Sequence, residues 1–140
     1  MNYTELKANI EDICENTFTA DQLAMFTQQA EQKIYNSVQI PALRKNVTGT
    51  LTINTKYLST PSDFLWSYSL AVVDAAGVYY FLLNKDVNFM REAYPNPAIT
   101  GLPKHYAYFD DDTFIVGPTP DAGYSSELHY GYYPQSIVVA

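Results

Sequence analysis

The chain has 140 residues, 47% of them hydrophobic and 16% charged, which suits one ordinary globular domain with a core of its own. Its formal net charge of -7 argues against binding to a phosphate backbone, because such binding needs clustered Lys and Arg. The start of the sequence lacks a signal-peptide pattern, and no apolar run is long enough to span a bilayer, so no membrane contact is expected. The single cysteine excludes an internal disulfide framework, and the 13 tyrosines are the outlier in the composition.

Two helices are predicted in residues 1–43, the helical part of the chain. Leu6, Ile10 and Ile13 follow the i, i+4, i+7 spacing of one helical face. Thr19 and Gln22 then form a capping-box pattern, which predicts the start of a second helix. The apolar stripe of this second helix consists of Leu23, Phe26, Ala30, Ile34 and Val38. The two helices and their short connection predict an αα-hairpin.

The remainder, residues 44–140, is predicted to be mostly β. Residues 47–53 alternate apolar and small polar side chains, and with residues 57–58 they predict a first hairpin. Residues 64–73 and 78–83, joined by a loop that ends at Gly77, predict a second hairpin.

The second half of the β part is predicted to contain one short helix and three strands. The helix covers residues 85–94, capped by Asn84 and ended by the prolines that follow. The strands cover residues 104–109, 113–116 and 125–133. The expected fold class is α+β: one domain over residues 1–140, in which an N-terminal helical hairpin and a short helix pack with a mainly antiparallel β-sheet system of six to eight strands.

Few side chains have the spacing of a metal site. Asp110, Asp111 and Asp112 lie between two predicted strands and lack the ligand pattern of a calcium loop, so a turn is the preferred interpretation. His105 and His129 each stand alone on a strand, and Cys14 is expected to be a buried or half-buried apolar residue. We therefore predict no metal and no cofactor.

Catalytic motifs are also missing. The sequence has no G-x-S-x-G, P-loop or G-x-G-x-x-G pattern, which removes the commonest hydrolase and nucleotide-binding interpretations. A glycan hydrolase would need a close carboxylate pair, for which Asp63, Asp111 and Glu127 are the candidates. We expect no enzyme activity and no catalytic residue.

Tyrosines recur at period two on the predicted strands. Tyr106 and Tyr108 fall on one strand face, as do Tyr130 and Tyr132. Such stripes suit core and edge packing, a protein interface or a carbohydrate platform, because tyrosine combines a large ring with a polar tip. The carbohydrate platform motivates one alternative function, a carbohydrate-binding β module of a phage tail or surface protein.

An ordered set of motifs runs through the β part. In chain order they are residues 57–64 (YLSTPSDF), Ser69-Leu70, residues 102–106 (LPKHY), Phe109-Asp110, residues 117–121 (GPTPD), Tyr124 and residues 127–134 (ELHYGYYP). With the second helix included, this set resembles the head-to-tail connector, or adaptor, proteins in the neck of tailed bacteriophages.

The resemblance implies a non-enzymatic structural protein of the virion neck and tail, assembled in the cytoplasm of the bacterial host. Such proteins form a homomeric ring, typically of about twelve copies, below the portal protein, and seat tail or nozzle proteins. DNA passes through the ring without specific binding, and an acidic lumen would favour that passage by repulsion.

The end of the sequence departs from the family pattern. Members usually continue past the Tyr-Tyr-Pro strand into further helices, whereas this sequence stops at an apolar run over residues 137–140. Either a neighbouring subunit covers this run, or the C-terminal helices of the family are absent from this sequence. The candidate protein-interface residues are Ile137, Val138, Val139, Tyr132 and Tyr133.

Overall fold

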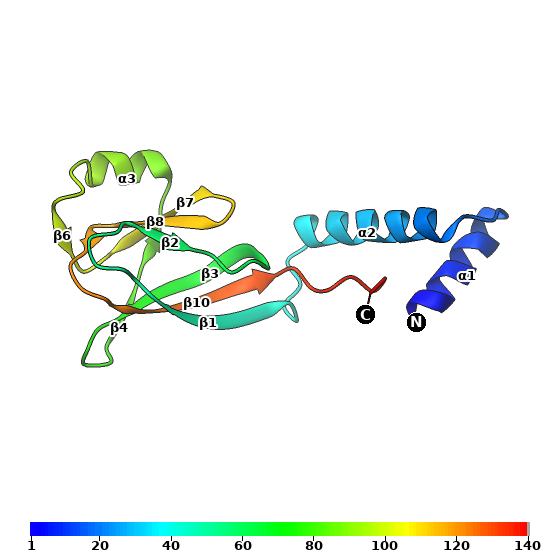
Figure 1. Cartoon of the computed structure of the whole chain (residues 1–140), viewed down its shortest axis with the longest axis horizontal. Coiled ribbons are helices and arrows are strands. Elements are labelled where there is room, and N and C mark those ends of the chain that lie inside the picture. The colour runs from blue at the N-terminus through cyan, green and yellow to red at the C-terminus, as the bar shows by residue number, and fades with distance from the viewer. Residues whose placement is uncertain (140) are drawn as a thin grey trace. The chain divides into compact units, whose positions relative to one another are not determined.

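A computed structural model describes residues 1–139 of the chain. The chain is divided into two compact units: Met1–Leu43 together with the segment that begins at Tyr133, called here the helical unit, and Arg44–Tyr132, called the β unit. Within residues 1–139, three helices and mainly antiparallel sheets confirm the predicted α+β class (Figure 1).

The helical unit contains α1 (Tyr3–Cys14) and α2 (Ala20–Ser37), each started by a capping box. Asn2 accepts a hydrogen bond from the Glu5 amide, and Thr19 accepts one from the Gln22 amide as predicted. The helix signals in the sequence were therefore correct in type and position, because caps depend on residues only three positions apart.

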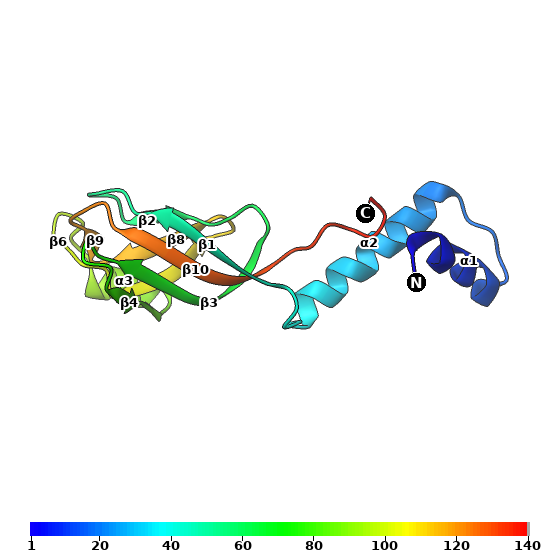
Figure 2. The same ribbon diagram turned by 90° about the horizontal axis from the view of Figure 1, so that it is seen from below.

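The β unit contains two four-stranded sheets. The first has the order β1 (Arg44–Thr50), β10 (Ser125–Tyr132), β3 (Phe64–Val73), β4 (Tyr79–Phe81), and all of its pairs are antiparallel. The second has the order β2 (Tyr57–Ser59), β8 (Thr113–Gly117), β7 (His105–Asp110), β5 (Leu83–Asn84). A two-stranded sheet joins β6 (Thr100–Gly101) to β9 (Thr119–Pro120) in parallel. Figure 2 shows β1, β10 and β3 side by side.

Both large sheets contribute to the main core of the β unit. Its buried residues are Leu51, Leu70, Val72, Leu82, Tyr106, Phe114, Val116, Leu128 and Tyr130. A smaller cluster of Met90, Ala107 and Ile115 packs α3 (Val87–Ala93) against β7 and β8. No helix in the described part of the chain combines the length and apolar character needed to cross a membrane.

One of the two predicted hairpins is wrong. The strand expected over residues 47–53 is β1, which pairs with β10 and sets Val47 opposite Leu128, while β2 pairs with β8. Alternation along a strand indicates which side chains face inward, but it does not identify the neighbouring strand. The second hairpin is confirmed by the pairing of Val73 with Tyr79 and by Gly77, whose φ is 81°.

Two smaller predictions also need correction. Asp86, not Asn84, caps α3, because its carboxylate accepts the Phe89 amide at 2.6 Å while Asn84 belongs to β5. The strand count within residues 1–139 is ten rather than six to eight, because β5, β6 and β9 are two-residue strands. Strands this short carry too few residues to show a period.

Candidate protein interface

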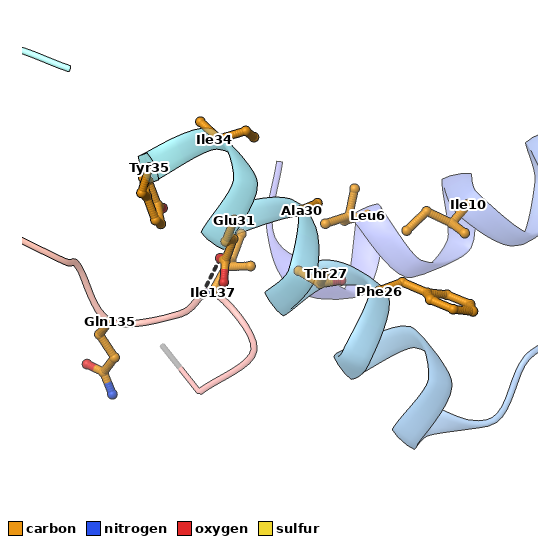
Figure 3. A pocket seen from close by; sticks show the side chains of 10 residues that line it. All are labelled: Leu6, Ile10, Phe26, Thr27, Ala30, Glu31, Ile34, Tyr35, Gln135 and Ile137. Carbon is orange, nitrogen blue, oxygen red and sulfur yellow. Dashed lines mark hydrogen bonds between the residues drawn. The ribbon is translucent and has the colours of Figure 1, made fainter. Parts of the chain in front are cut away.

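An apolar groove of about 520 Å³ opens on the helical unit. One wall comes from α1 and the floor from α2, and residues after Tyr133 form the far side (Figure 3). The lining residues are Leu6, Ile10, Phe26, Thr27, Ala30, Glu31, Ile34, Tyr35, Gln135 and Ile137. Glu31 supplies the only charge among these ten side chains.

The groove stays open because the two helices bury very little of their apolar stripe. In the described residues of the helical unit, only Leu23 and Thr27 are buried. Phe26 is 40% exposed and Ile34 is 50% exposed, although both belong to the apolar stripe of α2. An amphipathic helix in water is stabilised mainly by packing of that stripe, so the unit presents an incompletely covered surface.

Residues 133–139, called here the C-terminal segment, lie against α2 through two specific contacts. The Ile137 amide donates to Glu31 Oε1 at 2.9 Å, as the dashed line in Figure 3 shows. The Tyr133 ring meets the Tyr35 ring edge to face, with centroids 5.3 Å apart. Burial, with the negative charge of Glu31, raises the pKa of the Tyr133 hydroxyl. The C-terminal segment is thus held against α2 by one carboxylate and one aromatic ring.

The predicted interface residues fall in both units. Tyr132 ends β10 and packs against the core of the β unit, with the Lys45 ammonium 4.1 Å from its ring centroid. Tyr133, Ile137 and Val138 are half-buried in the helical unit, whereas Val139 is 65% exposed. Sequence reasoning singled out the segment but not the groove, because Glu31 and Ile137 are 106 positions apart. The Glu31 carboxylate, next to the apolar stripe of α2, was the one feature of the sequence that could have indicated the groove.

A second exposed apolar surface lies on the β unit and is called here the edge strip. It consists of Val78, Tyr79, Tyr80, Phe81 and Leu83. Strand β4 is last in its sheet and β5 is last in the other, so the strip follows two sheet edges. The Tyr79 and Phe81 rings stack with centroids 6.2 Å apart. Exposed apolar patches of this kind mark interaction sites more often than isolated surface residues do.

Two of the three carboxylates considered for hydrolase chemistry, Asp63 and Glu127, accept hydrogen bonds from side chains of other strands. Asp63 accepts hydrogen bonds from Lys45 at 2.7 Å and from the Tyr130 hydroxyl at 2.8 Å. Burial acts to raise the pKa of Asp63, but these bonds outweigh it and the pKa is lowered. Glu127 accepts the Tyr79 hydroxyl at 2.9 Å. Both carboxylates therefore have structural partners.

The Asp triplet forms a turn between β7 and β8, as predicted. Asp110 Oδ1 accepts the Asp112 amide at 3.2 Å, which is the local bond expected of Asp in a turn. Within residues 1–139, no group of three His, Cys, Asp or Glu side chains is placed to hold a metal ion.

Both histidines have aromatic neighbours, and the prediction for the cysteine is wrong. His105 Nδ1 lies 2.6 Å from the Tyr94 hydroxyl, and burial lowers the pKa of His105. The His129 ring lies 5.6 Å from the Tyr68 ring. Cys14 is exposed rather than buried or half-buried, because no other element covers its face of the last turn of α1.

The tyrosine stripes are largely core. Tyr106 and Tyr130 are each 3% exposed, and Tyr132 packs against the same cluster. Tyr108 is more exposed, but its hydroxyl lies 2.7 Å from Ser67 Oγ. The core-packing interpretation is therefore confirmed for Tyr106 and Tyr130.

Comparison with known families gives one match over the full chain. The model described as SU10 adaptor protein matches residues 1–140. No curated protein matches the chain. The family match includes the helical unit with its groove as well as the β unit, so it does not depend on one motif.

Proposed function

Because the chain belongs to the SU10 adaptor family, a family of phage head-to-tail adaptors, we propose that it forms the homomeric ring that joins the portal to the tail. The family makes it a structural component of the virion. In this proposal the ring lies below the portal and contacts tail or nozzle proteins. We expect about twelve copies, matching the closed rotational symmetry usual in such assemblies.

The incomplete core of the helical unit is the observation that carries this proposal. Within the described residues of that unit, two side chains are buried, while Phe26 and Ile34 stay largely exposed around the groove. Such a unit gains stability when a neighbouring subunit covers its apolar face. We assign the predicted interface residues to this contact, with Tyr133, Ile137, Val138 and Val139 as its direct members and Tyr132 as their anchor in the β unit.

The charge of the chain supports the passage of DNA through the ring. The net charge is -7, from 15 acidic and 8 basic residues. A lumen with an acidic surface repels the phosphate backbone, so a duplex moves through it without being held. In this proposal residues 1–140 act as one connector domain, with the helical unit and the β unit as its two parts.

We propose no catalytic role for the chain. Asp63 and Glu127 accept hydrogen bonds from tyrosine hydroxyls, and Asp111 lies in the turn between β7 and β8. A glycosidase needs two carboxylates across one cleft, with one of them able to protonate a leaving group. Asp63 and Glu127 are already engaged in hydrogen bonds with tyrosine hydroxyls, which does not favour such a pair.

The test is a native mass measurement of the purified chain, alone and mixed with its portal protein. We expect a discrete complex with one ring of this chain on each portal. Ile34→Asp places a charge in the groove and should abolish the ring, whereas Lys33→Asp, on the preceding residue of α2, should retain it. A chain that stays monomeric and shows no binding to the portal contradicts the proposal.

A further inference from the structure

The helical unit displays both halves of a peptide-recognition site. The groove provides apolar walls, the Glu31 carboxylate as a hydrogen-bond acceptor and the Tyr35 ring as an aromatic contact. The C-terminal segment provides a matching backbone amide at Ile137 and a matching ring at Tyr133. A segment that contacts the groove is therefore part of this chain, and every copy carries one groove and one segment.

Val139 does not line the groove when the segment contacts its own chain. The Val138 amide donates to Ser136 Oγ, and the Val139 amide donates to the Ser136 carbonyl at 3.1 Å. This local turn leaves Val139 65% exposed. In an extended peptide, Ile137 and Val139 would point to the same side, because side chains alternate along an extended backbone. An extended segment would therefore place two apolar side chains in the groove instead of one.

We propose that copies of this chain exchange their C-terminal segments, so that the segment of each subunit binds in extended form in the groove of the next subunit. This inference rests on the proposed ring. The exchange keeps the Ile137 to Glu31 hydrogen bond and the Tyr133 to Tyr35 ring contact, and adds Val139 to the buried surface. Exchange of an identical element is a low-cost route to association, since the contacts already exist within one chain.

A second copy is the occupant that the two surfaces favour. Groove and segment are different surfaces of one chain, so pairing them between copies gives a head-to-tail contact. A closed ring of such contacts fills every groove and uses every segment. Glu31 is the only charged side chain that lines the groove. Residues 133–139 have no acidic side chain that would repel it.

Cross-linking between two populations of the chain tests the exchange. Both populations carry Cys14→Ser, which removes the native thiol. One has Ala30→Cys on the groove, and the other has Gln135→Cys on the segment and an affinity tag. These two positions line the groove without making its specific contacts. The populations are co-expressed, their rings are isolated, and a short bismaleimide is added. The matched control adds Ile137→Asp to the tagged population, which disfavours binding of the segment.

The expected result is a covalent dimer of one tagged and one untagged chain in intact rings, with loss of that dimer when Ile137→Asp is present. A third chain carries both Ala30→Cys and Gln135→Cys. If rings form without the mixed dimer, and this chain is bridged only within itself, the exchange is overturned and the proposed function stands. A dimer that persists with Ile137→Asp also overturns it. Absence of any ring by native mass overturns the proposed function and the exchange together.

Discussion

The hydrogen bonds around Asp63 tie three strands of one sheet, and their removal should measurably weaken the β unit. Asp63 immediately precedes β3, Lys45 lies on β1 and Tyr130 lies on β10. We consider the variants Asp63→Asn, Tyr130→Phe and the double substitution. Asn keeps an acceptor oxygen without its charge, and Phe keeps the ring without its hydroxyl. Each single change therefore removes the charge-assisted bond while preserving shape.

The magnitude follows from the burial of the partners. The Tyr130 residue is 3% exposed, and a hydrogen bond to a charged group contributes about 1.5–3 kcal/mol to the free energy of unfolding. The Lys45 to Asp63 pair has side chains 48% and 29% exposed, so it adds only about 0.2–1 kcal/mol. Each single variant should lose about 1.5–3 kcal/mol, and the double variant should lose about 1 kcal/mol less than the sum.

The same network predicts a dependence of stability on pH. Burial, followed by the bond to Asp63, raises the pKa of Tyr130 from its ordinary 10.0 to about 12. A tyrosine whose pKa is higher in the folded chain than in the unfolded chain stabilises the fold while it is protonated. This contribution is therefore full below pH 10.0, the unfolded pKa, and is lost as the pH rises toward 12. The pKa of Asp63 is lowered from 3.8, so its contribution is full above that value and is lost as the pH falls below it.

Urea unfolding followed by the fluorescence of Trp66, the single tryptophan, measures these effects. Titration toward high pH should destabilise the native chain more than Tyr130→Phe, which lacks the titrating hydroxyl. If the two single substitutions add to within about 0.3 kcal/mol, Asp63 and Tyr130 are not coupled and the reasoning is refuted.

Four further predictions concern packing and exposure. Gly131→Ala should cost about 1–3 kcal/mol in thermal unfolding, because its Cβ would clash with the indole ring of Trp66; an unchanged melting temperature would contradict this. Met90→Ala should cost about 2–5 kcal/mol in urea unfolding, since Met90 is the fully buried residue of α3, and a cost near zero would contradict this. Phe81→Ser, at a side chain 68% exposed, should change the unfolding free energy by less than about 0.5 kcal/mol but weaken the ring in native mass spectra. Cys14 should react with a maleimide in the folded chain as fast as in urea, and protection would contradict its exposure.

Part of the candidate interface was accessible from sequence. The apolar run that contains Ile137, Val138 and Val139 was identified as an interface candidate because such residues need cover. The groove was not predicted, because it forms only when α1, α2 and the C-terminal segment come together. The edge strip was also not predicted, since period two along residues 78–83 suggests that alternate side chains face inward, whereas five of these six are exposed.

The sequence by itself determined the features that depend on near neighbours. The Thr19 capping box, the helix over α2, the turn at the Asp triplet and the hairpin through Gly77 each involve residues a few positions apart. Local propensity and hydrogen bonding decide such features before any tertiary contact forms.

Only the tertiary structure decided which distant residues meet. Strand β1 pairs with β10, which lies near the other end of the β unit. The hydrogen bond from Tyr130 to Asp63 joins residues 67 positions apart, and the bond from Ile137 to Glu31 joins residues 106 positions apart. Alternation along a strand or a helix face shows that a side chain needs a partner, and many distant side chains satisfy that need equally well. Packing selects among them, because the whole core must be filled at once.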